Sequence, residues 1–293
     1  MLNKVSIHQL FYLILSLFLI FITQQNPFLK ITDIHSSLTI LFLVIMSLGI
    51  SHGAADSIVI WKIFPKIRIK AIAFLIYLLV VSLGLLLWFL SPILGLITLL
   101  LLSIIHFGQS DLSYLSGVTQ GIKISWGFVM SLLPVVFFEN DVKSIFEALV
   151  DSDINAEVFA TLKIITIIFI GSFLFLVYIN KDINKKDKSF LTLEFLITLI
   201  LAGLLQPLYW FTFYFCFLHG LRALINIGIK SLGDFILLIF FTLPVTFFSY
   251  YILLEGLKIN YLTIIFSILM ALTIAHMLLP SINRLLLKAI DNR

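Results

Sequence analysis

The stretch GISHGAADSIVIW, residues 49–61, ends an apolar run that begins near Ile34, and it places His52 and Asp56 one helical turn apart. An ionisable side chain in the hydrocarbon part of a bilayer costs roughly 2.5 to 3.5 kcal/mol on insertion scales. If the run crosses a membrane, the pair therefore indicates a functional site.

The composition is that of a polytopic membrane protein. Of the 293 residues, 61% are hydrophobic and 12% are charged, and the mean hydropathy is +1.16. Soluble domains carry about twice this share of charged residues. We therefore predict an all-α membrane protein, a bundle of about ten transmembrane helices in a single domain of residues 1–293. The predicted segments, each near the length that crosses about 30 Å of hydrocarbon, are 7–23, 34–61, 71–90, 92–112, 124–138, 158–179, 190–206, 208–229, 234–254 and 261–282.

Two of the divisions between segments depend on proline. Ser91-Pro92 separates the third segment from the fourth, and Gln206-Pro207 separates the seventh from the eighth. Because proline either ends a helix or kinks it, the number of spanning helices is predicted as eight to ten.

Lysine and arginine predict the orientation. They collect in loops 62–70 and 180–188 and near the C-terminus, whereas 139–157 is acidic. By the positive-inside rule, we expect a multi-pass protein of the cell membrane with cytoplasmic N- and C-termini. The net charge of +4 follows from this topology, and no basic patch with interleaved aromatic residues indicates nucleic acid.

Four of the six histidines are predicted to lie deep in the membrane. His8 and His35 are at helix ends, where water or lipid headgroups solvate an imidazole. The other four lie roughly 9 to 15 Å from the cytoplasmic ends of their segments, at 1.5 Å per residue. These four, which are expected to form one layer, are His52, His106, His219 and His276.

A layer of imidazoles is typical of a metal site. The single cysteine, Cys216, excludes both an intrachain disulfide and a thiolate cluster. Imidazole ligands without thiolates suit iron, copper or zinc. Gly53 and Gly108 lie close to these histidines, and small residues allow helix backbones to approach closely in membranes.

Three charged residues are predicted to support the site. Asp56 and Asp111 follow His52 and His106 at about one turn, so each is expected to accept the distal N–H of an imidazole. Asp111 also lies near a helix end, where a solvated or capping role is an equal alternative. Arg222, near mid-membrane, requires an anionic or carbonyl partner, and Asp56 and Asp111 are the candidates.

The motifs SHGAAD followed by IW, HFGQSD, FLHGLRAL and AHMLLP, in this order between Gly49 and Pro280, resemble the Brp/Blh family of membrane β-carotene 15,15′-dioxygenases. The resemblance implies an Fe(II) enzyme that uses O2 to split β-carotene at its central double bond into two molecules of retinal, the chromophore of rhodopsins. It also implies that His52, His106 and His219 are iron ligands and that no catalytic residue beyond the ligands is needed.

One position departs from the family pattern. The third family motif is H-x-x-R-H, whereas this chain has Ala223 in place of the second histidine. Three alternatives stay open: His276 supplies the missing ligand, three histidines hold the iron, or the chain has lost dioxygenase activity.

Two other function classes also fit intramembrane histidines. One is a haem- or metal-binding electron-transfer protein, and the other is a proton-coupled transporter with a His/Asp relay. A transporter is expected to show inverted repeats with interrupted helices, and no convincing pair is present. Carotenoid cleavage is the preferred hypothesis. The 29 phenylalanines suit an apolar tunnel, although most are expected to face lipid.

Overall fold

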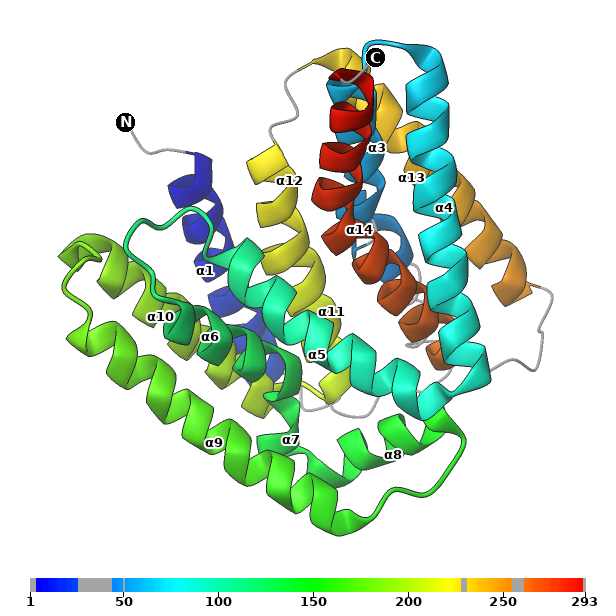
Figure 1. The fold of residues 1–293 in the computed structure, drawn as a ribbon. Coiled ribbons are helices and arrows are strands. Elements are labelled where there is room, and N and C mark those ends of the chain that lie inside the picture. The colour runs from blue at the N-terminus through cyan, green and yellow to red at the C-terminus, as the bar shows by residue number, and fades with distance from the viewer. Residues whose placement is uncertain (1–3, 26–43, 50, 228–230, 255–260, 292–293) are drawn as a thin grey trace.

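The computed structural model describes the whole chain except residues 1–3, 26–43, 50, 228–230, 255–260 and 292–293. Every regular element in the described part is a helix (Figure 1). Two elements, η2 and η3, are π-helices, with backbone hydrogen bonds five residues apart. In chain order the elements are α1 (Lys4–Gln25), η2 (Ile45–Gly49), α3 (Ser51–Ile63), α4 (Ile67–Leu90), α5 (Pro92–Asp111), α6 (Gln120–Leu132), α7 (Pro134–Phe137), α8 (Glu139–Val150), α9 (Ala156–Ile179), α10 (Lys185–Leu204), α11 (Pro207–Phe213), η3 (Tyr214–Gly220), α12 (Leu221–Ile227), α13 (Leu232–Leu254) and α14 (Tyr261–Asp291).

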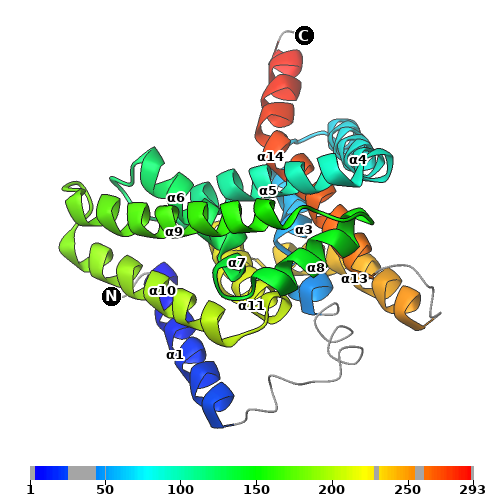
Figure 2. The ribbon, with the colours of Figure 1, turned by 90° about the horizontal axis from the view of Figure 1, so that it is seen from below.

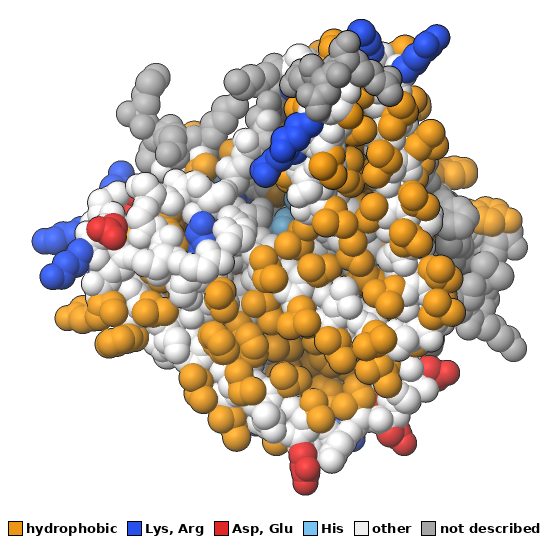
Figure 3. Space-filling model, viewed as in Figure 1, with side chains coloured by type: hydrophobic (Ala, Val, Ile, Leu, Met, Phe, Trp, Pro, Cys, Tyr) orange, Lys and Arg blue, Asp and Glu red, His pale blue; other side chains and the backbone are white. Residues whose placement is uncertain are grey.

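Among the described residues, 6 helical stretches are long and apolar enough to cross a membrane. Their outward faces carry large exposed hydrophobic side chains such as Phe89 and Ile168, and hydrophobic side chains cover much of the face seen in Figure 3. Such a surface suits lipid rather than water. The prediction of an all-α polytopic membrane protein is confirmed. The six stretches are Val5–Gln25, Ile67–Leu90, Pro92–Asp111, Ala156–Ile179, Pro207–Ile227 and Leu262–Ala289.

The predicted set of ten spans is wrong at segment 124–138. Helix α6 in this region has 13 residues, about 20 Å at 1.5 Å per residue, which is too short for the hydrocarbon layer. Pro134, which has no N–H to donate, begins the separate short helix α7. The acidic stretch that follows contains the helix α8, which buries Val142 and Leu149 against the bundle. The polypeptide is therefore divided here into three short helices.

Three other predicted segments correspond to helices that are not among the six stretches. Segment 34–61 contains η2 and α3, but its first part, with His35, lies outside the described residues. Segments 190–206 and 234–254 correspond to α10 and α13. In the described part of the chain, α10 lacks the composition of a span, and the apolar stretch of α13 is Leu232–Leu243, so the predicted span 234–254 stays a prediction. Charged residues at the start of α10, including Asp187 and Lys188, account for its exclusion.

Both predicted proline divisions are helix boundaries. Helix α4 ends at Leu90 and α5 begins at Pro92, and α10 ends at Leu204 before α11 begins at Pro207. Ser91 between the first two is extended, with φ −152° and ψ 88°, because the residue before a proline disfavours the helical region. These breaks let consecutive helices leave in different directions (Figure 1).

Helices α5 and α6 pack backbone to backbone through two glycines, and α6 lies between α5 and α9 (Figures 1 and 2). A Cβ added at Gly127 would lie 1.8 Å from the carbonyl oxygen of Ile104, and one at Gly108 would lie 2.0 Å from that of Lys123. The close approach predicted for Gly108 is confirmed. At Gly53 the prediction is wrong, because a Cβ there would meet nothing within 4 Å.

Gly127→Ala is expected to destabilise the protein by about 3 kcal/mol, because the added methyl meets a backbone oxygen that no rotamer change can move. Gly171→Ala on α9 is the matched control, since a Cβ there meets nothing within 4 Å and alanine favours a helix over glycine. The measurement is the thermal unfolding of both variants in detergent. Equal melting temperatures for the two variants would contradict the close contact between α5 and α6.

Candidate functional site

Three of the four predicted histidines come together in the centre of the bundle. The ring centroid of His106, on α5, lies 4.9 Å from that of His219, on η3, and 4.9 Å from that of His276, on α14. Both contacts are edge-to-face, with interplanar angles of 74° and 79°. The predicted single layer is confirmed for these three residues.

The fourth histidine, His52, has its backbone at the start of α3, but its side chain lies outside the described residues. The next residue, Gly53, lines the same small cavity as His106 and His276. Helix α3 therefore borders the histidine centre. The open space at Gly53 belongs to this cavity rather than to a contact between helices.

The orientation of His219 is set by Asp111, whose carboxylate is fully buried. Nδ1 of His219 donates to Oδ1 of Asp111 over 2.7 Å. Oδ2 accepts from the Tyr214 hydroxyl at 2.7 Å and from Nε1 of Trp126 at 3.0 Å. With the proton on Nδ1, the Nε2 of His219 is the nitrogen that can bind a metal.

Asp56 holds His276 in the same way. Nδ1 of His276 donates to Oδ1 of Asp56 over 2.7 Å, and the Tyr77 hydroxyl donates to Oδ2 at 3.1 Å. The His276 side chain is 29% exposed, and histidine atoms are visible in a recess of the face in Figure 3. Two Tyr–Asp–His units thus converge on His106.

The predicted pairing of the two aspartates is corrected. Asp111 binds His219 instead of His106, and Asp56 binds His276, while its predicted partner His52 has no described side chain. Spacing along one helix shows only which residues share a face, and the actual partners come from other helices. Asp111 is also not a solvated helix-end residue, since it is fully buried.

The predicted partner of Arg222 is also wrong. The guanidinium binds the carboxylate of Glu194 on α10 through both terminal nitrogens, with Nη1 at 3.0 Å from Oε1, and both side chains are fully buried. Asp111 contributes only its backbone carbonyl, which accepts from Nη1 at 3.1 Å. The signal for Glu194 was present, because a lone acidic residue in an apolar segment needs a partner as much as an arginine does.

His8 is another correction. It was predicted to lie among headgroups, but it is 5% exposed, and its Nε2 lies 2.9 Å from the carbonyl oxygen of Phe217 in η3. Helix α1 packs against α10 and α12. The contact of His8 with Phe217 therefore links α1 to the π-helix that carries His219.

The π-helix η3 passes close to η2. A Cβ at Gly49 would lie 2.6 Å from the ring of Phe215, so the two π-helices touch where only glycine fits. Both lie at predicted ligand positions: η2 is followed by α3, which carries His52, and η3 contains His219 as its sixth residue. Single π-turns often mark functional sites.

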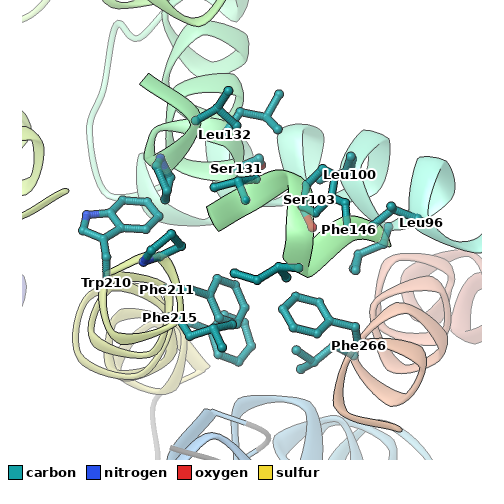
Figure 4. Close-up of a pocket in the computed structure, with 18 of the residues that line it drawn as sticks. Leu96, Leu100, Ser103, Ser131, Leu132, Phe146, Trp210, Phe211, Phe215 and Phe266 are labelled. Atoms are coloured by element: carbon teal, nitrogen blue, oxygen red, sulfur yellow. The ribbon is translucent and has the colours of Figure 1, made fainter. Parts of the chain in front are cut away.

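An apolar cavity, drawn with part of its lining in Figure 4, has His106 among its lining residues. It contains about 880 Å³ of empty space, part of it open to the outside, and Phe146, Phe211 and Phe266 are among its lining residues. His106 and Phe215 line both this cavity and the small cavity at the histidines, so an apolar ligand can reach His106.

The donor chemistry fits a divalent transition metal, although the described side chains do not complete a metal site. No group of three His, Cys, Asp or Glu side chains is arranged to hold a metal ion in the part of the chain that the structure describes. The side chain of His52, at the border of the centre, is not among these described side chains. Carboxylate-bound imidazoles are nevertheless the usual arrangement of histidine ligands.

Comparisons with known proteins agree with these features. A family model described as "Beta-carotene 15,15'-dioxygenase" matches residues 43–282. The "Beta-carotene 15,15'-dioxygenase" of uncultured marine bacterium 66A03 is 28% identical over 190 residues, which cover 61% of this chain and 65% of that protein. The chain thus spans just under two thirds of the length of this curated relative. No solved structure matches.

Glu194→Gln is expected to destabilise the protein by about 3 to 5 kcal/mol, because it leaves the buried guanidinium of Arg222 without its counter-charge. The matched control is Glu139→Gln, which breaks the partly exposed Lys163–Glu139 pair and should change stability by about 1 kcal/mol or less. Thermal unfolding in detergent measures both. Similar losses in the two variants would contradict the role assigned to the buried pair.

Proposed function

Because the chain belongs to the beta-carotene 15,15'-dioxygenase family, we propose that it cleaves the central double bond of β-carotene or a related carotenoid with O2. The carbon–carbon double bond is broken and each carbon takes one oxygen atom, so β-carotene yields two molecules of retinal and no further reductant is needed. The observation that carries the proposal is the apolar cavity ending at the histidine centre.

We further propose that Fe(II) binds to His52, His106, His219 and His276. Three of these side chains are already adjacent, and α3 brings His52 to the border of the same cavity. Imidazole ligands are typical of non-haem iron. A bound ferrous ion would supply the activation of O2, which is the part of the chemistry that protein side chains do not provide.

The formal charges near the centre support a dication. Glu194 neutralises Arg222, which leaves the carboxylates of Asp56 and Asp111, each bound to one histidine. Two negative charges beside neutral imidazoles balance a divalent ion. A carboxylate on the far nitrogen also increases the basicity of a histidine ligand.

His276 is the ligand that compensates for Ala223. It makes the same Nδ1 contact with an aspartate as His219 does, at the same distance of 2.7 Å. Both aspartates also accept from a tyrosine hydroxyl. Of the three alternatives left open by the sequence, this geometry favours the first, in which His276 replaces the second histidine of the third family motif.

The remaining protein groups bind, orient and exclude water. The phenylalanine- and leucine-lined cavity takes the polyene from the bilayer, and its apolar walls keep the reacting double bond away from water. The proposed location is the cell membrane, with multiple spans and both termini in the cytoplasm. The retinal product is proposed to pass to a rhodopsin.

Cells that accumulate β-carotene are expected to lose their orange colour and to form retinal when they produce this protein. His219→Ala should prevent both changes because it removes a proposed ligand, whereas Glu139→Gln, at a partly exposed position, should not. The measurement is chromatographic quantification of carotenoid and retinal. Unchanged carotenoid in the presence of folded, iron-loaded protein would show that β-carotene is not the substrate.

His276→Ala is expected to lower the affinity for iron about as severely as His52→Ala. The loss should be at least about 10- to 100-fold, which is the typical effect of removing a residue that only hydrogen-bonds to a metal ligand. In that background, Ala223→His should restore binding, because residues at i and i+4 lie about 6 Å apart on one helix face. The measurement is the iron content of the purified variants.

The matched control is His8→Ala, which removes a buried histidine that binds a backbone carbonyl outside the centre. It should retain iron. If His276→Ala holds iron and cleaves carotenoid like the parent, the ion is held by the other three histidines alone.

A further inference from the structure

Gly53 is a buried glycine of helix α3 that close packing does not explain. A Cβ added to it would meet nothing within 4 Å among the atoms that the structure describes. At other buried glycines an added Cβ would lie 1.8 to 2.9 Å from a neighbouring atom, namely at Gly49, Gly84, Gly95, Gly108 and Gly127. A neighbour excludes a side chain at those positions, whereas at Gly53 the space for a side chain is empty.

The backbone does not require a glycine at this position either. Gly53 lies in a helix, and the positive φ found at Gly117 is not found at Gly53. Within a helix, glycine is less favourable than alanine, because the chain loses more conformational freedom when it folds. Neither packing nor backbone conformation accounts for Gly53, which leaves the space beside it as the reason for a glycine.

That space is part of the small cavity at the histidine centre, which contains about 300 Å³ of empty space. Besides His106 and His276, its described lining consists of hydrocarbon side chains, Gly53 and Thr273. The Thr273 hydroxyl already donates to a carbonyl oxygen of its own helix at 2.7 Å. A buried water molecule needs about two to four polar partners, so the side of the cavity away from the imidazoles suits a hydrocarbon group better than water.

The small cavity is also narrower than the apolar cavity, which contains about 880 Å³ of empty space. The two cavities share His106 and Phe215. Phe215 is held in place, because its ring stacks on that of His219 with centroids 5.6 Å apart and Gly49 of η2 lies against it. A polyene whose central double bond lies at the histidines must therefore fit between this ring and α3.

We propose that the space at Gly53 receives a methyl branch of the polyene, one of the two that flank the central double bond of β-carotene. The proposal rests on the proposed function and assigns it a specificity-determining residue. The branches are the widest points of the chain near its centre, and Gly53 is the part of the wall without a side chain. A methyl group has the size of the missing Cβ, so alanine at this position would occupy the place of the branch.

The test compares the parent with Gly53→Ala on two carotenoids, β-carotene and an analogue that lacks both methyl branches flanking the central double bond. For β-carotene we expect Gly53→Ala to lower kcat/KM by about 10- to 200-fold, the effect of one carbon too many in an apolar pocket. For the analogue the variant should match the parent, because the alanine methyl fills the place of the missing branch. The dissociation constants of metal-free protein, measured by carotenoid absorption, should show the same pattern.

The matched control is Gly171→Ala, at an exposed position of α9 where an added Cβ also meets nothing within 4 Å. It should leave kcat/KM for both carotenoids unchanged. Gly53→Ala should retain iron and unfold at a temperature no lower than that of the parent, since alanine favours a helix. A loss of β-carotene cleavage in this variant is then not a loss of folding.

The proposal is overturned if Gly53→Ala cleaves β-carotene like the parent, or if iron-loaded Gly53→Ala loses activity on both carotenoids to the same extent. A raised KM for O2 with an unchanged KM for β-carotene would also overturn it, because the space would then serve the gas. A failure of the proposed function looks different, because then the iron-loaded parent cleaves neither carotenoid. In that case, or if Gly53→Ala loses iron, the dissociation constants of the metal-free proteins decide, and equal weakening for both carotenoids, or none, overturns the proposal.

Discussion

The Asp111 carboxylate is the group on which the bundle centre depends. It is buried without solvent at the end of α5, and it accepts from His219 and Tyr214 of η3 and from Trp126 of α6. Its backbone carbonyl accepts from Arg222 of α12, which in turn binds Glu194 of α10. In an apolar interior each of these polar groups needs its hydrogen-bond partner. These contacts therefore fix the positions of α5, α6, α10, η3 and α12 relative to one another.

The two Tyr–Asp–His units divide the site into a closed half and an open half. His219 and Asp111 are fully buried, whereas the side chain of His276 is partly exposed. The closed half is held in place by the Asp111 carboxylate, by the Glu194–Arg222 ion pair and by the backbone contact of α5 with α6. The open half is formed by α3, α4 and α14, so the chain combines a rigid support with an accessible side of the same centre.

The convergence of His106, His219 and His276 could be predicted from the sequence because depth in a membrane is readable from segment ends. The hydrogen-bond partners on other helices could not be predicted, because periodicity relates only the residues of one helix. Arg222 was assigned to the wrong carboxylates for this reason, and Glu194 was overlooked inside an apolar segment. Segment 124–138 was mistaken for a span because its apolar character was clear while the break at Pro134 was not.

The Glu194–Arg222 pair also has a consequence for how the protein enters the membrane. Glu194 precedes Arg222 by 28 residues, so α10 emerges from the ribosome before the helix that neutralises its charge. Either side chain alone is costly in hydrocarbon, and the pair is stable only when both are in place. Insertion is therefore favoured when α10 and the segment from Pro207 to Ile227 enter together as a helical hairpin. Membrane insertion and assembly of the centre then become a single step for this part of the chain.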